Sequence, residues 1–344
     1  MNALIYALIE GYDRWGELPQ NVKNRVENAL KTASDGDKAA ACKEIEWCRK
    51  NNVEILCYGT PEYPRRMLNV PCSPLALFYR GTANLNAAHV VSIVGTRHIT
   101  NYGKELCARI CKEISELRKD VVIVSGLAYG VDIHSHRAAL DCGLETIGVV
   151  GHGLDRIYPS LHRDTAMRMA DHGGILSQFV TGTQPYAGNF VKRNRIVATI
   201  SDATIVIESA SKGGSLITAG MAKDARRALY ACPGRIGDTQ HEGCNLLISS
   251  GEAQILTSIS HMFEQLNWRP QNVMPINEED GNLTDESLSP EEISILKCLN
   301  EENELTVDQL TIRTKLPAYR IAAILMDLEM QGVVNVLPGG KYAK

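Results

Sequence analysis

Short, wholly apolar runs alternate with longer amphipathic segments through the middle of the chain. Runs of this kind are typical of strands buried on both faces, and the amphipathic segments are typical of helices that cover a sheet. We expect strands at 90–94, 121–124, 146–150, 175–176, 204–207, 229–232 and 253–256. We expect helices at 102–117, 131–142, 163–171, 187–200, 215–225 and 245–249. The alternation predicts an α/β fold with a doubly wound, mostly parallel sheet, whose ligands bind at the carboxyl ends of the strands.

The two ends of the chain have other patterns. Residues 22–30 and 39–50 have helical spacing, and short strands at 53–56 and 75–79 follow among several prolines. Near the C-terminus, three helices (290–299, 306–314 and 318–330) and a β-hairpin predict a winged helix-turn-helix. The predicted domains are an N-terminal helical region and lead-in at 1–80, the α/β domain at 81–260, an acidic linker at 261–289 and the winged helix at 290–344.

Composition places the protein in the cytoplasm. No run approaches the roughly 18 apolar residues of a membrane helix, and the first residues do not form a secretory signal. Ten cysteines without a C-x-x-C pair argue against both a disulfide framework and a zinc site. The net charge of −4 argues by itself against nucleic acid, but residues 260–288 hold one basic and six acidic residues. We therefore expect any anion site to be a local pocket in the middle of the chain.

Four loops at strand ends carry the candidate chemistry. They share small residues that expose backbone N–H groups, and such groups near a helix N-terminus favour phosphate. The loops are Gly95-Thr96-Arg97, Ser125-Gly126-Leu127-Ala128-Tyr129-Gly130, Gly151-His152-Gly153-Leu154-Asp155 and Gly213-Gly214-Ser215-Leu216-Ile217-Thr218. In any one loop taken alone, a tight turn is the favoured explanation of the glycines. Their coincidence, with Arg97 able to form paired hydrogen bonds to phosphate, favours an anion site.

A basic cluster precedes the most apolar part of one predicted helix. Lys192, Arg193, Asn194 and Arg195 stand before Ile196, and Lys192 and Arg195 share a helical face. The apolar remainder buries this helix, which brings the cations toward the strand ends. We interpret Phe190 as a core anchor, although a base could stack on it.

The acidic and imidazole groups nearby leave alternatives open. His134 and His136 lie on different helical faces near Asp132, which favours capping and hydrogen bonding over metal binding. Glu208 at a strand end is a candidate general base, a candidate ribose contact or a cap for the next loop.

At these positions the sequence resembles the DprA/Smf family of DNA-processing proteins. The matching motifs appear in family order: Ile93-Val94-Gly95-Thr96-Arg97, Val124-Ser125-Gly126-Leu127-Ala128-Tyr129-Gly130-Val131-Asp132, Gly151-His152-Gly153-Leu154-Asp155, Arg193-Asn194-Arg195-Ile196, Gly214-Ser215-Leu216-Ile217-Thr218-Ala219 and Gly243-Cys244-Asn245-Leu246-Leu247-Ile248.

The resemblance implies an extended Rossmann-like domain that forms a homodimer, binds single-stranded DNA and assists loading of the RecA recombinase. It implies no turnover chemistry, no cofactor and no metal. The DNA-binding positions that carry over are Arg97, Ser125, Gly126, Lys192, Arg193, Asn194, Arg195, Gly214, Ser215 and Thr218.

The alternative is a nucleotide-processing enzyme that resembles the LOG-type phosphoribohydrolases. Those enzymes need a glutamate shortly after a Gly-Gly loop, whereas Thr218 is followed by Ala219-Gly220-Met221. The C-terminal domain, with two more acidic than basic residues, is expected to bind DNA weakly. A chain ending near Leu266 should therefore keep most of its single-strand affinity.

Overall fold

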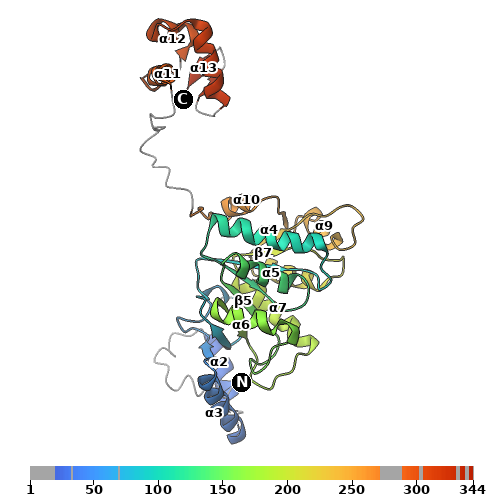
Figure 1. Cartoon of the computed structure of the whole chain (residues 1–344). Coiled ribbons are helices and arrows are strands. Elements are labelled where there is room, and N and C mark those ends of the chain that lie inside the picture. Colours follow the sequence, from blue (N-terminus) through green and yellow to red (C-terminus); the bar gives the residue numbers. More distant parts are fainter. Residues whose placement is uncertain are drawn as a thin grey trace. The chain divides into compact units, whose positions relative to one another are not determined.

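The computed structural model describes residues 20–31, 34–68, 70–271, 289–301, 305–330, 334–337 and 341–343 (Figure 1). The chain divides into two units, residues 1–273 and 274–344, which are treated separately below. Most of the predicted acidic linker and the predicted hairpin turn at 338–340 lie outside the described residues. No helix in the described ranges combines the length and apolarity needed to cross a bilayer.

The first unit contains a nine-stranded sheet in the order β1-β2-β6-β5-β4-β3-β7-β8-β9. Strands β3 to β9 are parallel, while β2 pairs antiparallel with both β1 and β6. The strands are β1 (Glu54–Cys57), β2 (Ala76–Gly81), β3 (His89–Val94), β4 (Val121–Ser125), β5 (Thr146–Val150), β6 (Gly173–Ser177), β7 (Ala203–Val206), β8 (Ala228–Ala231) and β9 (Gln254–Ile255). Strand β3 lies between β4 and β7, so the strand order reverses there, as in doubly wound folds.

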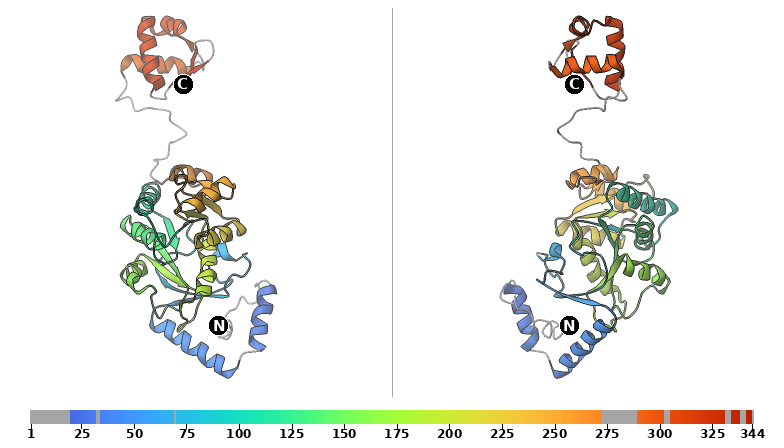
Figure 2. Two further views of the ribbon diagram at one scale, coloured as in Figure 1. Left: turned by 90° about the vertical axis from the view of Figure 1, so that its right-hand side faces the viewer. Right: turned by 60° about the vertical axis from the view of Figure 1, so that its left-hand side comes forward.

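Helices cover both faces of this sheet (Figure 2). Residues of α4, α5 and α10 share one core cluster with the strands, while α7, α8 and α9 contribute to the cluster on the other face. The helices of this unit are α2 (Gln20–Lys31), α3 (Asp35–Lys50), α4 (Asn101–Leu117), α5 (Val131–Asp141), α6 (Arg163–Asp171), α7 (Ala187–Ile200), α8 (Gly214–Asp224), α9 (Glu242–Ser249) and α10 (Ile259–Gln265). Strands β4, β5 and β6 are buried at every position, which confirms that continuous apolar runs indicate two-sided burial.

Two features at the ends of this unit differ from the sequence pattern. Helix α10 was not predicted, and it falls partly inside the segment assigned to the linker. Phe263 and Trp268 are buried, and the Trp268 ring packs edge-on against those of Phe263 and His89. At the other end, β1 and β2 of the predicted lead-in belong to the main sheet. The domain boundaries themselves stay a prediction.

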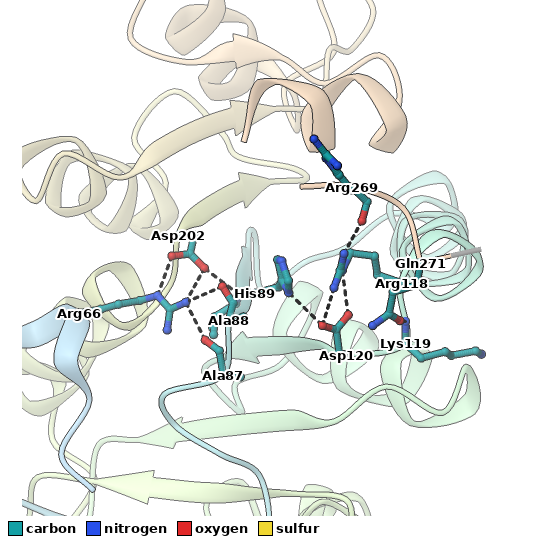
Figure 3. Close-up of polar contacts among 11 residues, drawn as sticks. Arg66, Ala87, Ala88, His89, Arg118, Lys119, Asp120, Asp202, Arg269 and Gln271 are labelled. Atoms are coloured by element: carbon teal, nitrogen blue, oxygen red, sulfur yellow. Dashed lines mark hydrogen bonds and ion pairs between the residues drawn. The ribbon is translucent and has the colours of Figure 1, made fainter. Parts of the chain in front are cut away.

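The amino ends of the central strands are tied by an ionic network (Figure 3). Arg66, in the short 3-10 turn η2 (Arg65–Met67), donates to both carboxylate oxygens of Asp202 at 2.6 and 2.8 Å, and Asp202 also accepts from the Val90 amide. Arg118 contacts Asp120 at 2.7 Å, and Asp120 contacts His89. Arg118 also donates to the Arg269 carbonyl oxygen. The network joins η2 of the lead-in and the segment after α10 to the amino ends of the central strands.

The second unit confirms the winged-helix expectation. Its three helices pack around apolar residues that include Leu299, Leu310 and Leu325. Its three strands form an antiparallel sheet in the order β10-β12-β11, of which β10 was not predicted. The elements are α11 (Pro290–Glu301), β10 (Leu305–Thr306), α12 (Val307–Thr314), α13 (Ala318–Met330), β11 (Asn335–Leu337) and β12 (Lys341–Ala343).

Candidate functional site

A crevice lies at the carboxyl ends of the strands beside the β3–β7 switch. Its larger pocket, of about 350 Å3, is lined by the loops after β3, β4 and β7 and by α7. A smaller pocket, of about 70 Å3, adjoins it over β5, and Arg97 and Phe190 line both. We call the two pockets together the carboxyl-end crevice. Of the residues predicted to bind DNA, the larger pocket brings together Arg97, Arg193, Asn194, Gly214, Ser215 and Thr218.

The N-terminus of α8 has open backbone amides. Gly213 caps this helix without a side-chain hydrogen bond, and no described residue accepts from the amides of Gly214 and Ser215. Gly214 is exposed, and a Cβ atom placed there would meet nothing within 4 Å. Unpaired amides at the positive end of a helix dipole attract an anion. Of the four predicted amide loops, this one has the properties of a phosphate site.

The loop after β3 is already occupied by a carboxylate from the chain itself. Glu208 is completely buried and accepts hydrogen bonds from the amide of Thr100, at 3.0 Å, and from its hydroxyl. Thr100 is the N-cap of α4. Among the roles left open for Glu208, the structure supports a cap, but the loop it caps is the one after β3 and not the loop that follows Glu208.

The loop after β4 is partly satisfied internally. The Val131 amide donates to the Thr96 carbonyl oxygen at 3.1 Å, and the Ala128 amide donates to Asp132 at 3.3 Å. Gly130 has φ of +77°, and a Cβ atom there would lie 2.1 Å from the Thr96 carbonyl oxygen. This glycine lets the first two loops touch, and its function here is the close approach of two backbones.

Aromatic rings line the crevice beside Arg97. The Arg97 guanidinium carbon lies 5.5 Å from the centre of the Phe190 ring, and the Tyr158 ring centre lies 6.1 Å from that of Phe190. Phe190 is half-buried and lines both pockets, so its interpretation as a core anchor was wrong. Tyr129 and Tyr158 are about half exposed and were missed. In the sequence, each of these two tyrosines could have been recognised as an aromatic residue within a strand-end loop.

Arg193 forms the floor of the crevice rather than its rim. Its side chain is 7% exposed and lies 3.5 Å from Asp132, while its Nε atom has no partner among the described residues. Burial lowers the pKa of Arg193, and the Asp132 carboxylate opposes that shift. A Cβ atom on Gly126 would lie 1.6 Å from the Arg193 guanidinium, so Gly126 makes room for this pair. Of the predicted site residues, Arg193 therefore forms a buried ion pair with Asp132, and Gly126 leaves room for that pair.

The basic cluster on α7 is divided by the phase of the helix. Phe190, Arg193, Asn194 and Val197 line the larger pocket, which is the i, i+3, i+4, i+7 spacing of a single face. Lys192 is exposed and lines neither pocket, and Arg195 donates to the Pro71 carbonyl oxygen at 3.2 Å. A DNA-binding role for these last two stays a prediction, but it would lie outside the crevice.

Ser125 and His136 support the crevice from below. The Ser125 hydroxyl donates to the Ile93 carbonyl oxygen at 2.6 Å. His136 is completely buried, contacts Thr146 and Gly126, and burial lowers its pKa to about 4. The expected hydrogen-bonding role of His136 is confirmed. No group of metal-ligating side chains gathers in the described ranges.

Comparisons with known proteins bear on the same segments. A family model described as DNA recombination-mediator protein A matches residues 54–267, and a model described as the DprA winged helix domain matches residues 282–340. Protein Smf from Synechocystis sp. is 31% identical over an alignment of 331 residues, and the match covers 87% of this chain and 82% of that protein. DNA processing protein DprA from Bacillus subtilis is 36% identical over 219 residues, covering 63% of this chain and 73% of that protein.

Two solved structures have a similar fold. That of DNA processing protein A from Streptococcus pneumoniae superposes with a TM-score of 0.62 at 28% identity, covering 77% of this chain and 93% of that one. That of DNA processing protein A from Helicobacter pylori, described for its unique single-stranded DNA binding mode, superposes with a TM-score of 0.56 at 30% identity. It covers 62% of this chain and 95% of that one.

Proposed function

The chain belongs to the DNA recombination-mediator protein A family, the DprA/Smf proteins, and on that premise we propose that the carboxyl-end crevice binds single-stranded DNA. The Helicobacter pylori relative is described as binding single-stranded DNA, which supports the proposal. Phosphate contacts made by amides and arginine carry no base preference, so we expect affinity without sequence specificity.

The observation that carries the proposal is the open N-terminus of α8, which lies in the same pocket as Arg97. No described residue forms an ion pair with Arg97. Asn194 and Thr218 line the pocket with side chains that no described residue hydrogen-bonds. These groups are all donors or can act as donors, so the pocket suits an anion that brings several acceptor oxygens.

The aromatic rings explain why the strand would be single. Phe190, Tyr129 and Tyr158 offer ring faces on which unpaired bases can stack, and each stacked base contributes about 1–3 kcal/mol. Paired bases already stack on one another within a duplex and cannot reach these rings. We therefore expect the crevice to prefer single strands over duplex of the same length.

The test is a titration of fluorescent single-stranded and duplex oligonucleotides at several salt concentrations. Affinity for the single strand should fall by about 0.7 log units per log unit of salt for each phosphate contact. Equal affinity for both forms, or an affinity that does not change with salt, would contradict the proposal.

We extend the proposal to a cytoplasmic homodimer that helps RecA assemble on the bound strand. The recombination-mediator description of the family supports the RecA step. The dimer is supported by an open sheet edge, where Ile255 of β9 and Leu246 of α9 are apolar and about half exposed. Light scattering should give the mass of two chains, and Ile255→Glu should reduce it to one. RecA filament assembly should accelerate when the protein is added.

The phosphoribohydrolase alternative has no support in the crevice. Such an enzyme needs a carboxylate that reaches the leaving ribose. Asp132, the acidic residue of the larger pocket, is paired with Arg193, and Glu208 is buried against Thr100. A nucleotide-hydrolysis assay run beside the titration should give no product above the buffer control.

A further inference from the structure

A further pocket, of about 160 Å3, lies outside the carboxyl-end crevice. A single loop separates it from the crevice. Its walls come from the end of α3, from β2, from the loop 154–157 and from α6. Three of its lining residues are arginines, Arg80, Arg156 and Arg163, and one is Trp47. We call it the arginine pocket. Asp155 is the acidic residue among its described lining residues, so the lining carries an excess of positive charge.

Two of the three arginines are not neutralised by any residue that the structure describes. Arg156 is held by Asp155 at 2.9 Å and by the Gln184 side chain at 2.7 Å. Arg80 and Arg163 are exposed, and no described residue forms an ion pair or a hydrogen bond with either guanidinium. Elsewhere on α6, Arg168 pairs with Asp141 at 3.1 Å. The arginines of α6 are therefore not unpaired in general: Arg163 in the pocket is unpaired among the described residues, whereas Arg168 outside the pocket is paired.

The aromatic wall of the pocket is fixed in place by an N-terminal helix. Glu44 of α3 is buried and accepts from the Thr181 amide at 2.9 Å and from its hydroxyl at 2.5 Å. Trp47 stands one turn further along α3 and is half-buried against the cluster that includes Phe78. A partly exposed ring beside unpaired guanidinium groups is the combination found where single-stranded nucleic acid binds.

The loop that separates the arginine pocket from the carboxyl-end crevice lines both of them. Residues 154–157 belong to the arginine pocket, and Tyr158 and Pro159 belong to the smaller pocket of the crevice. A strand leaving the crevice past Tyr158 would meet Arg156 next. We propose that the arginine pocket binds the nucleotides that extend beyond the crevice, with phosphates at Arg80 and Arg163 and a base against Trp47. This inference rests on the proposed function of the crevice and adds a second stretch of strand to it.

The test measures affinity against oligonucleotide length with the full chain. Fluorescence anisotropy is recorded for dT oligonucleotides from about 4 to about 20 nucleotides. The variant is the double substitution Arg80→Gln and Arg163→Gln. Each lost phosphate contact should cost about fivefold at 0.1 M salt, so the double variant should bind the longest oligonucleotide about 25-fold more weakly. Its affinity for the shortest ones, which fill only the crevice, should equal that of the native protein.

Two matched variants separate the possible outcomes. Arg168→Gln removes the same charge from the same helix outside the pocket, and it should match the native protein at every length. Arg97→Ala should weaken binding at every length, because it acts in the crevice. If the native protein binds single strands but the double variant behaves like Arg168→Gln, the arginine pocket is not part of the path and the crevice proposal survives. If the double variant loses affinity equally at all lengths while its melting temperature is unchanged, the two pockets are not sequential and the inference fails.

Discussion

The two ends of the same parallel sheet hold arginines in opposite states. At the amino end, Arg66 and Arg118 each contact a carboxylate through two nitrogens, with distances of 2.6–2.8 Å. At the carboxyl end, Arg97 lies over an aromatic ring and no described residue forms an ion pair with it. An arginine that already has a carboxylate partner holds the fold together, whereas one without a partner remains available to an anion.

Arg193 shows that the end of the sheet at which an arginine lies does not by itself decide whether the arginine is available to an anion. It lies at the carboxyl end and lines the crevice, yet it is buried and paired with Asp132, as the amino-end arginines are paired. What separates the two classes is a carboxylate within reach, which a distant element supplies to Arg66 and Arg193 and a nearby residue supplies to Arg118. The predictions below test this distinction in order of decreasing effect.

The largest effect is expected from Arg193→Ala. It leaves the buried Asp132 carboxylate without a counter-charge, which should destabilise the protein by about 3–5 kcal/mol. Thermal unfolding measures the loss. Arg193→Met combined with Asp132→Asn leaves no buried charge and should recover part of the stability. If Arg193→Ala lowers DNA affinity but leaves the melting temperature unchanged, Arg193 belongs with Arg97 and the distinction fails.

Arg66→Ala should destabilise the fold without affecting DNA. Asp202 would lose a partner at a site where the two side chains are 15% and 25% exposed, so we expect a loss of about 3 kcal/mol. The variant should bind single-stranded DNA with native affinity below its melting temperature. A weakened affinity in the folded variant would show that the amino end contributes to binding.

Gly214→Asp should act on DNA alone. A Cβ atom there meets no described atom within 4 Å, so the fold should remain intact, and a carboxylate at the first turn of α8 would even suit the helix dipole. The same carboxylate would occupy the phosphate position and repel the strand, lowering affinity by about 100-fold, or about 2.7 kcal/mol. Gly214→Ala is the control and should bind almost as well as the native protein. Equal losses in both variants would mean that space and not charge matters.

Arg97→Ala should weaken single-strand binding about fivefold at 0.1 M salt, for the loss of one phosphate contact. Lys192→Ala should have a smaller effect, because Lys192 lines neither pocket of the crevice. Both variants should melt as the native protein does, since neither cation is paired with a described acidic residue. A larger effect for Lys192→Ala would place the strand on the outer face of α7.

The smallest effect on single-strand affinity is expected from removing the winged helix. On α13, Arg320 is paired with Glu291 at 2.8 Å, while Tyr319 and Met326 are largely exposed. That surface suits a protein partner better than a polyanion.

The truncated variant should end after Gln271 and not near Leu266, because Trp268 is buried and the Gln271 amide donates to the Leu117 carbonyl oxygen. A loss of single-strand affinity beyond about twofold would identify the winged helix as a DNA module.

The sequence by itself determined most of the elements, the winged helix and the family. Fully buried parallel strands appear in a sequence as unbroken apolar runs, and the motif order across the strand-end loops identified the DprA/Smf resemblance that the comparisons confirm. It also predicted an anion site at the strand ends, because glycine-rich turns before helices are local features.

Only the tertiary structure decided which of those local features remain open. Glu208 fills the N-terminus of α4 from a different strand, the phase of α7 turns Lys192 and Arg195 away from the crevice, and α3 brings Trp47 to Arg80 and Arg163. The physical reason is that an amide or a guanidinium is available only when no acceptor lies within hydrogen-bond distance. For Thr100, Arg66 and Arg193 that acceptor comes from residues far away in the chain, whose approach no local spacing records.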